Sequence, residues 1–230
     1  MRQAENWTVW AKKADFQEIG KKYGIDQVTA RIMRNRDIIT DEEINSYLNG
    51  TMDMLPSPYL LKDVKKAAGI LAEKIKSGKK ICIIGDYDID GVQSSYILWE
   101  GIENLGGKVY VTIPDRIKDG YGVNEQLVEA AIEEGADTIL TCDNGIAAAD
   151  ALKRAKENGL TVIVTDHHEI PFCEENGERK EILPDADAIV NPKQKDCAYP
   201  FKEICGAVVA WHLIRVLLSL IHISEPTRPY

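Results

Sequence analysis

Eight acidic and imidazole side chains are grouped in three short segments of the 230-residue chain. The segments read Gly-Asp-Tyr-Asp-Ile-Asp-Gly from residue 85, Cys-Asp-Asn-Gly from residue 142 and Thr-Asp-His-His-Glu from residue 165. Mixed carboxylate and imidazole ligands with open coordination positions suit Mn²⁺ or Mg²⁺ better than structural zinc. The candidate site residues among them are Asp86, Asp88, Asp90, Asp143, Asp166, His167 and His168.

Each segment has a simpler explanation when it is taken alone. Asp-x-Asp-x-Asp-Gly also opens an EF-hand loop, but that loop needs Glu where Ile97 stands and a helix where a strand is expected here. Asp143 before Asn-Gly is compatible with plain turn chemistry, and His167 with His168 is compatible with a helix cap or a buried pair. Because all three segments follow strands of one sheet, the metal site is the favoured interpretation.

The elements that must position these segments are short apolar runs that alternate with helical segments. Continuous apolar strands between helices predict an α/β fold, a parallel sheet with helices on both faces. Strands are expected at 81–84, 109–113, 138–141, 161–164 and 188–190, and helices near 92–104, 125–134, 147–158 and 206–217. Ligands of such sheets bind at the carboxyl ends of the strands. In an extended segment residues two apart point the same way, so the three aspartates of 85–91 are expected to face one location.

Residues 1–58 are predicted to form a small helical N-terminal region, with Asp41 as a helix N-cap. A long amphipathic helix from about Leu60 to Ser77 then leads into the sheet domain, residues 59–217. The sequence has neither a Gly-x-Gly-x-x-Gly segment after the first strand nor a P-loop, so it does not support a nucleotide cofactor.

The composition is that of an ordinary folded domain. Hydrophobic residues make up 44%, charged residues 28%, and the mean hydropathy is -0.25. The sequence shows no transmembrane candidate and no signal-peptide pattern, so a cytoplasmic protein without membrane association is expected. The five cysteines lack Cys-x-x-Cys spacing, which favours buried reduced thiols over disulfides or a zinc ribbon.

The net charge of -9 is unevenly distributed, because residues 1–80 are net basic and residues 81–218 are strongly acidic. An acidic main domain argues against simple binding of nucleic acid, which usually requires a basic surface. Clustered carboxylates become reasonable when divalent cations lie between them. A solvated acidic surface also accounts for much of the excess.

An ordered set of motifs between about Trp7 and Leu217 resembles the RecJ family of single-strand-specific exonucleases within the DHH phosphoesterases. The motifs are GDYDIDG, IPDRIKDGYGVN, TCDNGI, VTDHHE, VNPKQ and CGAVVAWHLIRVLL. The resemblance implies a DHH phosphoesterase domain that hydrolyses phosphodiesters by a two-metal mechanism, with Mn²⁺ or Mg²⁺ as cofactor.

The resemblance also implies roles for individual residues. Asp86, Asp88, Asp143 and His167 match the family's metal-binding motifs. Asp90 is placed in the same constellation as a further metal ligand, His168 as a catalytic residue beside Asp88, Asp143 and His167, and Asp166 as a residue that orients the ligands.

Arg116 and Tyr121 match positions where the family meets the nucleic-acid strand, since Arg suits phosphate and Tyr suits base stacking. A solvated loop charge and a core aromatic are the simpler explanations of these two residues. The partner implied is single-stranded DNA, together with a single-strand-binding protein and a RecQ-type helicase.

The chain departs from the family pattern after the helix that begins near Gly206. A further metal-binding aspartate, a second domain and an oligonucleotide-binding domain are expected there and are not in this sequence. Residues 218–228 resemble a translated sequencing adapter, so 218–230 are expected to be a non-native tail. We expect the chain as written to be a poor nuclease, with residues after about Leu217 packing weakly.

Two other functions stay open at this point. One is a small DHH phosphodiesterase that acts on oligonucleotides or cyclic dinucleotides, or a related manganese pyrophosphatase. The other is a non-catalytic DHH scaffold, whose mark would be loss of the acidic ligands. The helical N-terminal region and the Gly-Tyr-Gly element favour the RecJ type.

Overall fold

The computed structural model describes residues 12–116, 122–175 and 178–221 of the chain. The chain divides into two compact units, residues 1–55 and 56–230. Among the described residues, no helix is both long and apolar enough to cross a bilayer.

The described part of the first unit contains three short α-helices, α1 (Phe16–Tyr23), α2 (Gln27–Asn35) and α3 (Asp41–Asn49), followed by a 3-10 turn at Met52–Met54. The helix boundaries follow from local capping. Asp15 and Asp26 accept hydrogen bonds from the first free backbone amides of α1 and α2. The prediction that Asp41 caps α3 is wrong, because Thr40 is the N-cap and forms a capping box with Glu43. The predicted helical region at the N-terminus is confirmed.

The second unit is built on a five-stranded sheet of order β2-β1-β3-β4-β7 in which every pairing is parallel. Its strands are β1 (Lys80–Ile84), β2 (Lys108–Thr112), β3 (Thr138–Cys142), β4 (Thr161–Thr165) and β7 (Ala188–Val190). Each lies within two residues of the strand expected from the sequence, and the predicted α/β fold class is confirmed. The strand order reverses beside β1, so the segments that follow β1 and β3 are neighbours at a topological switch point.

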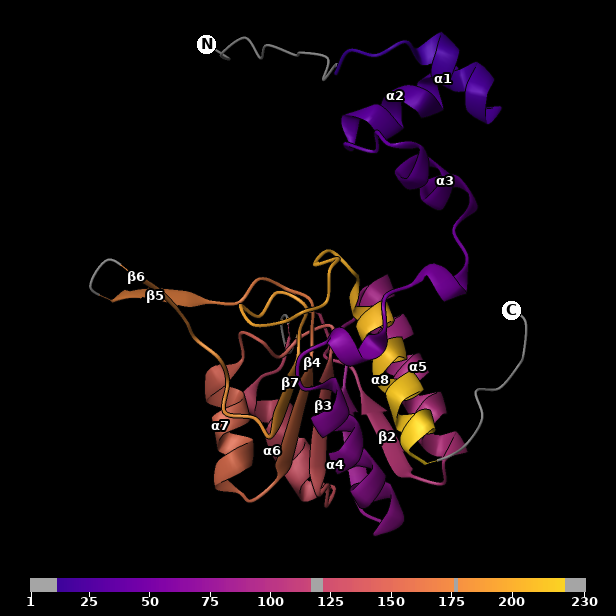
Figure 1. Ribbon diagram of the computed structural model, residues 1–230. Coiled ribbons are helices and arrows are strands. Elements are labelled where there is room, and N and C mark those ends of the chain that lie inside the picture. Colours follow the sequence, from indigo (N-terminus) through magenta and orange to yellow (C-terminus); the bar gives the residue numbers. More distant parts are fainter. Residues whose placement is uncertain (1–11, 117–121, 176–177, 222–230) are drawn as a thin grey trace. The chain divides into compact units, whose positions relative to one another are not determined.

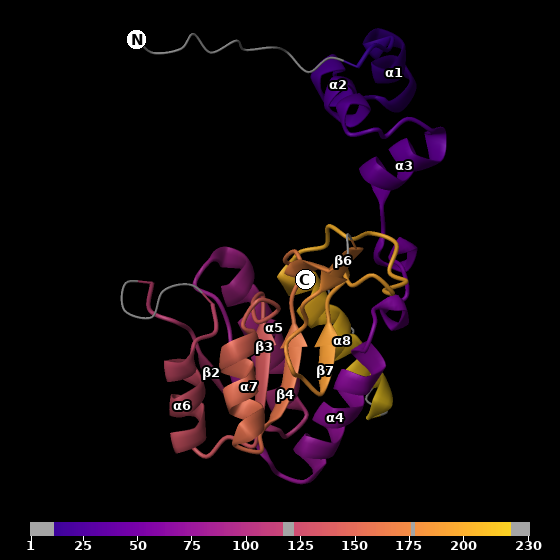
Figure 2. The same ribbon diagram turned by 90° about the vertical axis from the view of Figure 1, so that its left-hand side faces the viewer.

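Helices cover both faces of this sheet (Figures 1 and 2). One face carries α4 (Val64–Lys76), α5 (Ile89–Asn104) and α8 (Gly206–Leu220), and the other carries α6 (Glu125–Glu133) and α7 (Ala149–Glu157). Alternate residues of β1 enter the two cores: Ile81 and Ile83 face the first, and Cys82 and Ile84 the second. Burial on both faces explains why the centres of β1, β3, β4 and β7 are apolar, whereas the edge strand β2 is only partly buried.

Two helix starts differ from the sequence expectation. The helix expected from Leu60 begins only at Val64, because Pro58–Leu60 forms a 3-10 turn and Asp63 adopts φ 58°. The helix expected near Val92 begins at Ile89, inside the first ligand segment, with Asp88 as its N-cap. The expectation of an extended backbone across residues 85–91 is therefore wrong beyond Asp88.

Beyond the expected elements, β5 (Phe172–Glu175) and β6 (Glu178–Glu181) form an antiparallel hairpin that projects from the second unit (Figure 1). The expectation that packing weakens after Leu217 is wrong as far as Ile221. Helix α8 continues to Leu220, and Leu218, Leu220 and Ile221 pack against the core while partly buried. The remaining tail lies outside the described residues.

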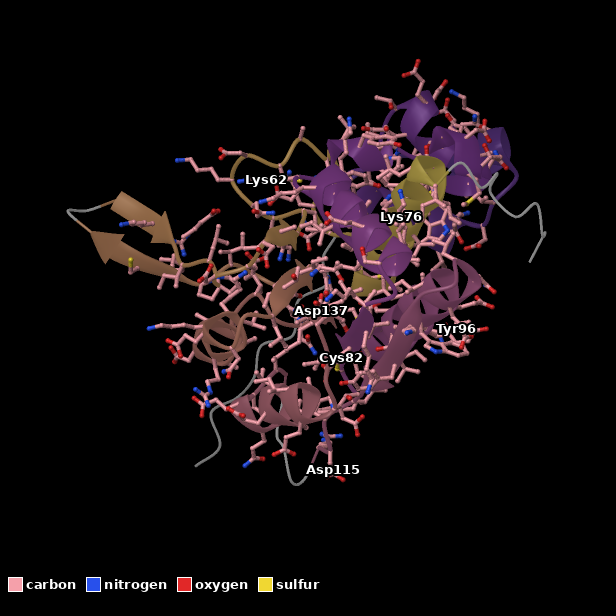
Figure 3. The ribbon with its side chains drawn as sticks, turned by 90° about the horizontal axis from the view of Figure 1, so that it is seen from below. Lys62, Lys76, Cys82, Tyr96, Asp115 and Asp137 are labelled. Atoms are coloured by element: carbon pink, nitrogen blue, oxygen red, sulfur yellow. The ribbon has the colours of Figure 1, made fainter. Side chains whose placement is uncertain are left out.

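Ion pairs lie at the amino ends of the strands, away from the ligand segments. Asp137, labelled in Figure 3, directly precedes β3 and lies 2.5 Å from the Nζ of Lys74 and 3.3 Å from that of Lys79. None of the five cysteines forms a disulfide; Cys82, Cys142 and Cys197 are buried as expected, whereas Cys205 is exposed.

Candidate metal centre

The backbone that carries the ligands is an extension of the sheet. The amide of Asp143 donates to Thr165 O, and the amide of Asp166 donates to Val190 O, both at 3.0 Å. The ladder thus runs one residue past β3 and β4, which fixes the two aspartates at the carboxyl edge. Asp86 follows β1 at the same edge.

Two groups of potential ligand atoms meet there. Asp86, Asp88 and Asp143 present oxygens that all lie within 4.8 Å of one another, and so do the ligand atoms of Asp143, His167 and His168. Asp143 belongs to both groups. The structure therefore brings together the four residues whose positions match metal-binding motifs, and adds His168.

Asp143 is held in an uncommon backbone conformation, φ 59°. A non-glycine residue in this left-handed region carries strain of about 1 kcal/mol or more. The following residues hold the turn: Asn144 donates its Nδ2 to Gly85 O (2.7 Å), and Thr141 Oγ1 donates to Asn144 O (2.9 Å). Asn144 ties the β3 segment to the β1 segment, a contact that no sequence pattern had indicated. The turn and the ligand roles of Asp143 are thus compatible.

Two buried carboxylate oxygens in this centre have no hydrogen-bond donor among the described residues. They are Asp86 Oδ2 and Asp143 Oδ1. His167 Nε2 lies 3.0 Å from Asp143 Oδ1, at ion-pair distance but without hydrogen-bond geometry. Buried acceptors are normally satisfied, and an unsatisfied carboxylate is costly. A divalent cation bound by oxygen ligands would satisfy both oxygens, so the residues present fit such an ion.

The electrostatics agree with an accumulation of negative charge. Burial raises the pKa of Asp143; the neighbouring His167 opposes this shift, and the carboxylates of Asp90 and Asp88 add to it. The pKa of His167 is raised, chiefly by the Asp143 carboxylate beside it. These are the shifts expected of a site in which positive charge is in short supply.

Asp166 is committed to protein contacts. Its Oδ1 accepts from the amides of His167 (2.7 Å) and His168 (3.1 Å), and lies 2.7 Å from His168 Nδ1. Its Oδ2 accepts from the amide of Ile146 at 2.9 Å. Burial alone would raise the pKa of Asp166, but the hydrogen bonds from His168 and Ile146 outweigh it and lower that pKa. Asp166 thus joins the loop after β3 to the loop after β4.

Asp90 lies outside both ligand groups of the described residues. It sits in the first turn of α5, and its two oxygens accept the amides of Gly206 and Ala207. Its Oδ2 is also 3.4 Å from His167 Nε2.

Asn191, to which the sequence analysis assigned no role, contacts the backbone of the His167-His168 segment. Asn191 is fully buried, and its Nδ2 donates to His168 O at 3.0 Å. Its position in the VNPKQ motif was the available signal, but a motif quoted for resemblance does not indicate which atom it contacts.

Of the two residues expected to contact a nucleic-acid strand, the structure describes one, Arg116. Arg116 is exposed, and its guanidinium lies 5.5 Å from the centre of the Tyr87 ring, next to the ligand segment. Tyr121 lies outside the described residues.

A pocket of about 450 Å³ opens beside the centre. Its walls include apolar side chains, Val123 and Ile146, while Asn144, Asp166 and His168 contribute polar groups. A cluster of ligand atoms next to a partly apolar pocket can hold a charged group and a flat or aliphatic group of one substrate together.

Comparison with known proteins agrees with this geometry. The single-stranded-DNA-specific exonuclease RecJ of Bacillus subtilis is 42% identical over 214 residues, which cover 93% of this chain and 26% of the relative. A crystal structure of exonuclease RecJ bound to manganese aligns with TM-score 0.63 at 34% identity, over 72% of this chain and 40% of that one.

The RecJ structure in complex with Mn²⁺ from Thermus thermophilus aligns with TM-score 0.59 at 31% identity, over 78% of this chain and 24% of that one. The chain thus spans about a quarter of the length of the Bacillus relative it matches. The model of the DHH family, N-terminal domain, matches residues 80–228. The chain belongs to the DHH family.

Proposed function

We propose that this chain is the metal-holding part of a phosphodiesterase that removes nucleotides from single-stranded DNA in the 5′-to-3′ direction. The observation that carries the proposal is the pair of ligand groups that share Asp143, with two buried carboxylate oxygens that have no donor in the part of the chain that the structure describes. The similarity to RecJ exonucleases supports the substrate class.

In this proposal Asp86, Asp88, Asp143 and His167 hold the divalent cations, Mn²⁺ or Mg²⁺. When bound, the cations supply an activated water and stabilise the attacking and leaving oxygens at phosphorus. The protein's own task is placement. Asp143 is fixed by the sheet ladder and by its strained turn, so its carboxylate serves both ligand groups without rearranging.

His168 and Asp166 form the second part of the proposal. With Nδ1 held by Asp166, the His168 ring can present only its Nε2 to a bound group. We assign His168 to contact with the reacting phosphate and Asp166 to fixing the orientation of that ring. Arg116 is assigned to phosphate contact and Tyr121 to base stacking.

The wider setting is proposed on the same basis. The RecJ resemblance supports the proposals of a cytoplasmic location and of association with a single-strand-binding protein and a RecQ-type helicase. We also propose that residues 1–58 form a helical N-terminal region, that the phosphoesterase domain runs from 59 to 217, and that 218–230 are foreign to it.

The test is a nuclease assay of a chimera in which residues 7–217 replace the matching segment of the Bacillus relative. With Mn²⁺ it should release nucleotides from single-stranded DNA faster than from duplex, and Asp88→Asn in the chimera should remove that activity. Circular dichroism checks that both chimeras fold. A folded chimera without Mn²⁺-dependent cleavage would refute the proposal, and cleavage confined to dinucleotides would favour the small-phosphodiesterase alternative.

A further inference from the structure

A basic surface lies outside the metal centre, at the amino end of α4. Residues 62–80 contain seven lysines and two acidic residues, whereas the rest of the sheet domain is strongly acidic. Lys62, Lys65 and Lys66 line one shallow hollow of about 600 Å³. Lys65 and Lys66 are exposed, and Lys62 is half-buried. We call this hollow, with its three lysines and Tyr59, the α4 patch.

An aromatic ring lines the same hollow. Tyr59 is 48% exposed and lies beside the three lysines. Lysine side chains contact phosphates, and aromatic rings stack on unpaired bases, so the two together are typical of surfaces that bind single-stranded nucleic acid. An acidic polypeptide would use the lysines but has no flat group that requires the ring.

The patch is net positive, although two carboxylates also line it. Asp63 Oδ2 is engaged by the amide of Ile189 at 3.3 Å. Asp196 lies 3.6 Å from Lys62 Nζ, but its side chain is 77% exposed, so this ion pair is weak. In the part of the chain that the structure describes, no carboxylate lies within 4.0 Å of the Nζ of Lys65 or Lys66. These two ammonium groups are therefore available to a polyanion.

The patch lies at the same edge of the sheet as the metal centre. The carboxyl end of α4 is at the amino ends of the strands, because Lys74 forms an ion pair with Asp137 just before β3 (Figure 3). The amino end of α4 is consequently at the carboxyl ends of the strands (Figure 1). The contact from Asp63 to Ile189 places it beside β7, and β7 is the neighbour of β4, which leads to the two histidines.

The loop after β7 joins the patch to the metal centre. Lys193 Nζ lies 2.8 Å from Oε1 of Glu169, the residue that follows the two histidines. Three residues further along the loop, Asp196 contacts Lys62. Consecutive Cα atoms are about 3.8 Å apart, so the Cα atoms of Lys193 and Asp196 are separated by at most about 11 Å. A single strand that crosses this loop from the metal centre reaches the patch within a few nucleotides.

We propose that the α4 patch is a second contact surface for single-stranded DNA, at which the lysines bind phosphates and Tyr59 stacks on a base. The identification of the strand as DNA rests on the proposed function, whereas the surface rests on its own charges and geometry. A strand held at the patch is present at a high effective concentration at the metal centre, so the patch retains the substrate.

The patch is tested in EDTA, where metal and hydrolysis play no part. Fluorescence anisotropy measures binding of a labelled oligo(dT) of about 20 nucleotides in about 0.1 M salt. The variant Lys62→Gln/Lys65→Gln/Lys66→Gln should bind at least about tenfold more weakly than the wild type. Its plot of log K against log salt concentration should be less steep by about 2, because each lost phosphate contact removes about 0.7 from the slope.

The matched control is Lys76→Gln/Lys108→Gln/Lys153→Gln, which removes the same charge from exposed positions outside the patch. Its affinity should stay within about threefold of the wild type, since distant charges are screened. Circular dichroism checks that each variant folds. Equal losses in the two triple variants, or no binding of oligo(dT) by the wild type, would overturn the proposal.

The stacking role of Tyr59 has its own test. Tyr59→Leu should weaken binding of oligo(dT) by about 5- to 150-fold, the range for loss of one stacked base. Tyr59→Phe keeps the ring and loses only the hydroxyl, which lies 3.2 Å from Ser219 Oγ, so it should bind like the wild type. An abasic oligonucleotide should bind equally to Tyr59→Leu and wild type. A loss in Tyr59→Leu that is the same for both oligonucleotides would overturn the stacking role.

Failure of the patch and failure of the proposed function give different results. If the chimera with residues 7–217 did not cleave DNA, the proposed function would fail, and oligonucleotide binding in EDTA would still decide on the patch. If the chimera cleaved DNA while the patch and control variants bound oligo(dT) equally, the patch alone would be refuted.

Discussion

His168 Nδ1 and Asp166 Oδ1 lie 2.7 Å apart and share a hydrogen bond, although Asp166 is buried and His168 is partly exposed. The carboxylate also accepts three backbone amides from two different loops. One buried side chain thus sets the direction of an imidazole and the spacing of the loops that follow β3 and β4.

Replacement of Asp166 by Asn should destabilise the metal-free chain by about 1–3 kcal/mol. Asn has one acceptor oxygen in place of two, so at least one buried amide or the His168 ring loses its partner. Urea unfolding measures the effect, with Asp185→Asn, an exposed position, as the control expected within about 0.5 kcal/mol of wild type. Equal unfolding free energies for Asp166→Asn and wild type would show that the network contributes nothing.

His212 is expected to make the free energy of unfolding depend on pH. Burial, and to a smaller extent Arg215, lowers its pKa from 6.5 to about 4, and its Nε2 lies 2.9 Å from the hydroxyl of Tyr199. Because the folded pKa lies below the unfolded one, the unfolded state gains the proton first. Stability is therefore complete above about pH 6.5 and is lost as pH falls toward 4.

Between pH 7.5 and 5.0 the wild-type chain should lose roughly 2 kcal/mol more unfolding free energy than His212→Gln does. The difference between the two proteins isolates His212 from the carboxylates that also titrate in acid. Urea unfolding at the two pH values checks it. Parallel losses in both proteins would mean that His212 is not kept neutral by the fold.

Gly145 should not tolerate a side chain. Its φ is 102°, and an added Cβ would lie 2.4 Å from Thr141 Oγ1, the group that holds the Asn144 carbonyl. Gly145→Ala should cost about 1–3 kcal/mol of stability. Gly69→Ala in α4 is the matched control, since a Cβ there meets nothing within 4 Å and alanine favours a helix. If both variants unfolded alike, the turn after Asp143 would not be strained.

Asp88 has two separable roles, because it caps α5 through the Gly91 amide (2.9 Å) and also belongs to a ligand group. In EDTA, the free energy of unfolding of Asp88→Ala should be about 1 kcal/mol lower than that of the wild type, because the helix cap is lost. Asp88→Asn should be at least as stable as the wild type, since the repulsion between carboxylates is reduced. In thermal unfolding, added Mn²⁺ should raise the unfolding temperature of the wild type but of neither variant. If Mn²⁺ raised the unfolding temperature of Asp88→Asn as much as that of the wild type, Asp88 would not be a metal ligand.

The sequence predicted the sheet well because four of its five strands are largely buried on both faces, and such strands require a short continuous apolar run. The β5–β6 hairpin was missed since its strands carry charged residues such as Arg179 and Lys180 in place of an apolar pattern. The start of α5 was misplaced because an aspartate that looks like a ligand is at the same time a good N-cap.

For the site, the parallel topology alone brings Asp86, Asp143 and His167 to one edge, so their proximity could be predicted. The contact from Asp90 to Gly206 could not. It joins residues 116 apart and depends on the packing of α5 against α8, which no local pattern encodes.

The proposed function requires that Asp86, Asp88, Asp143 and His167 hold divalent cations. Crystals of the 230-residue chain soaked in Mn²⁺ would show this directly through anomalous diffraction at the manganese edge. We expect anomalous density among Asp86, Asp88, Asp143 and His167. It should be lost in crystals of Asp143→Asn, because Asp143 belongs to both ligand groups. Density that is absent from this edge of the sheet, or that persists unchanged in Asp143→Asn, would contradict it.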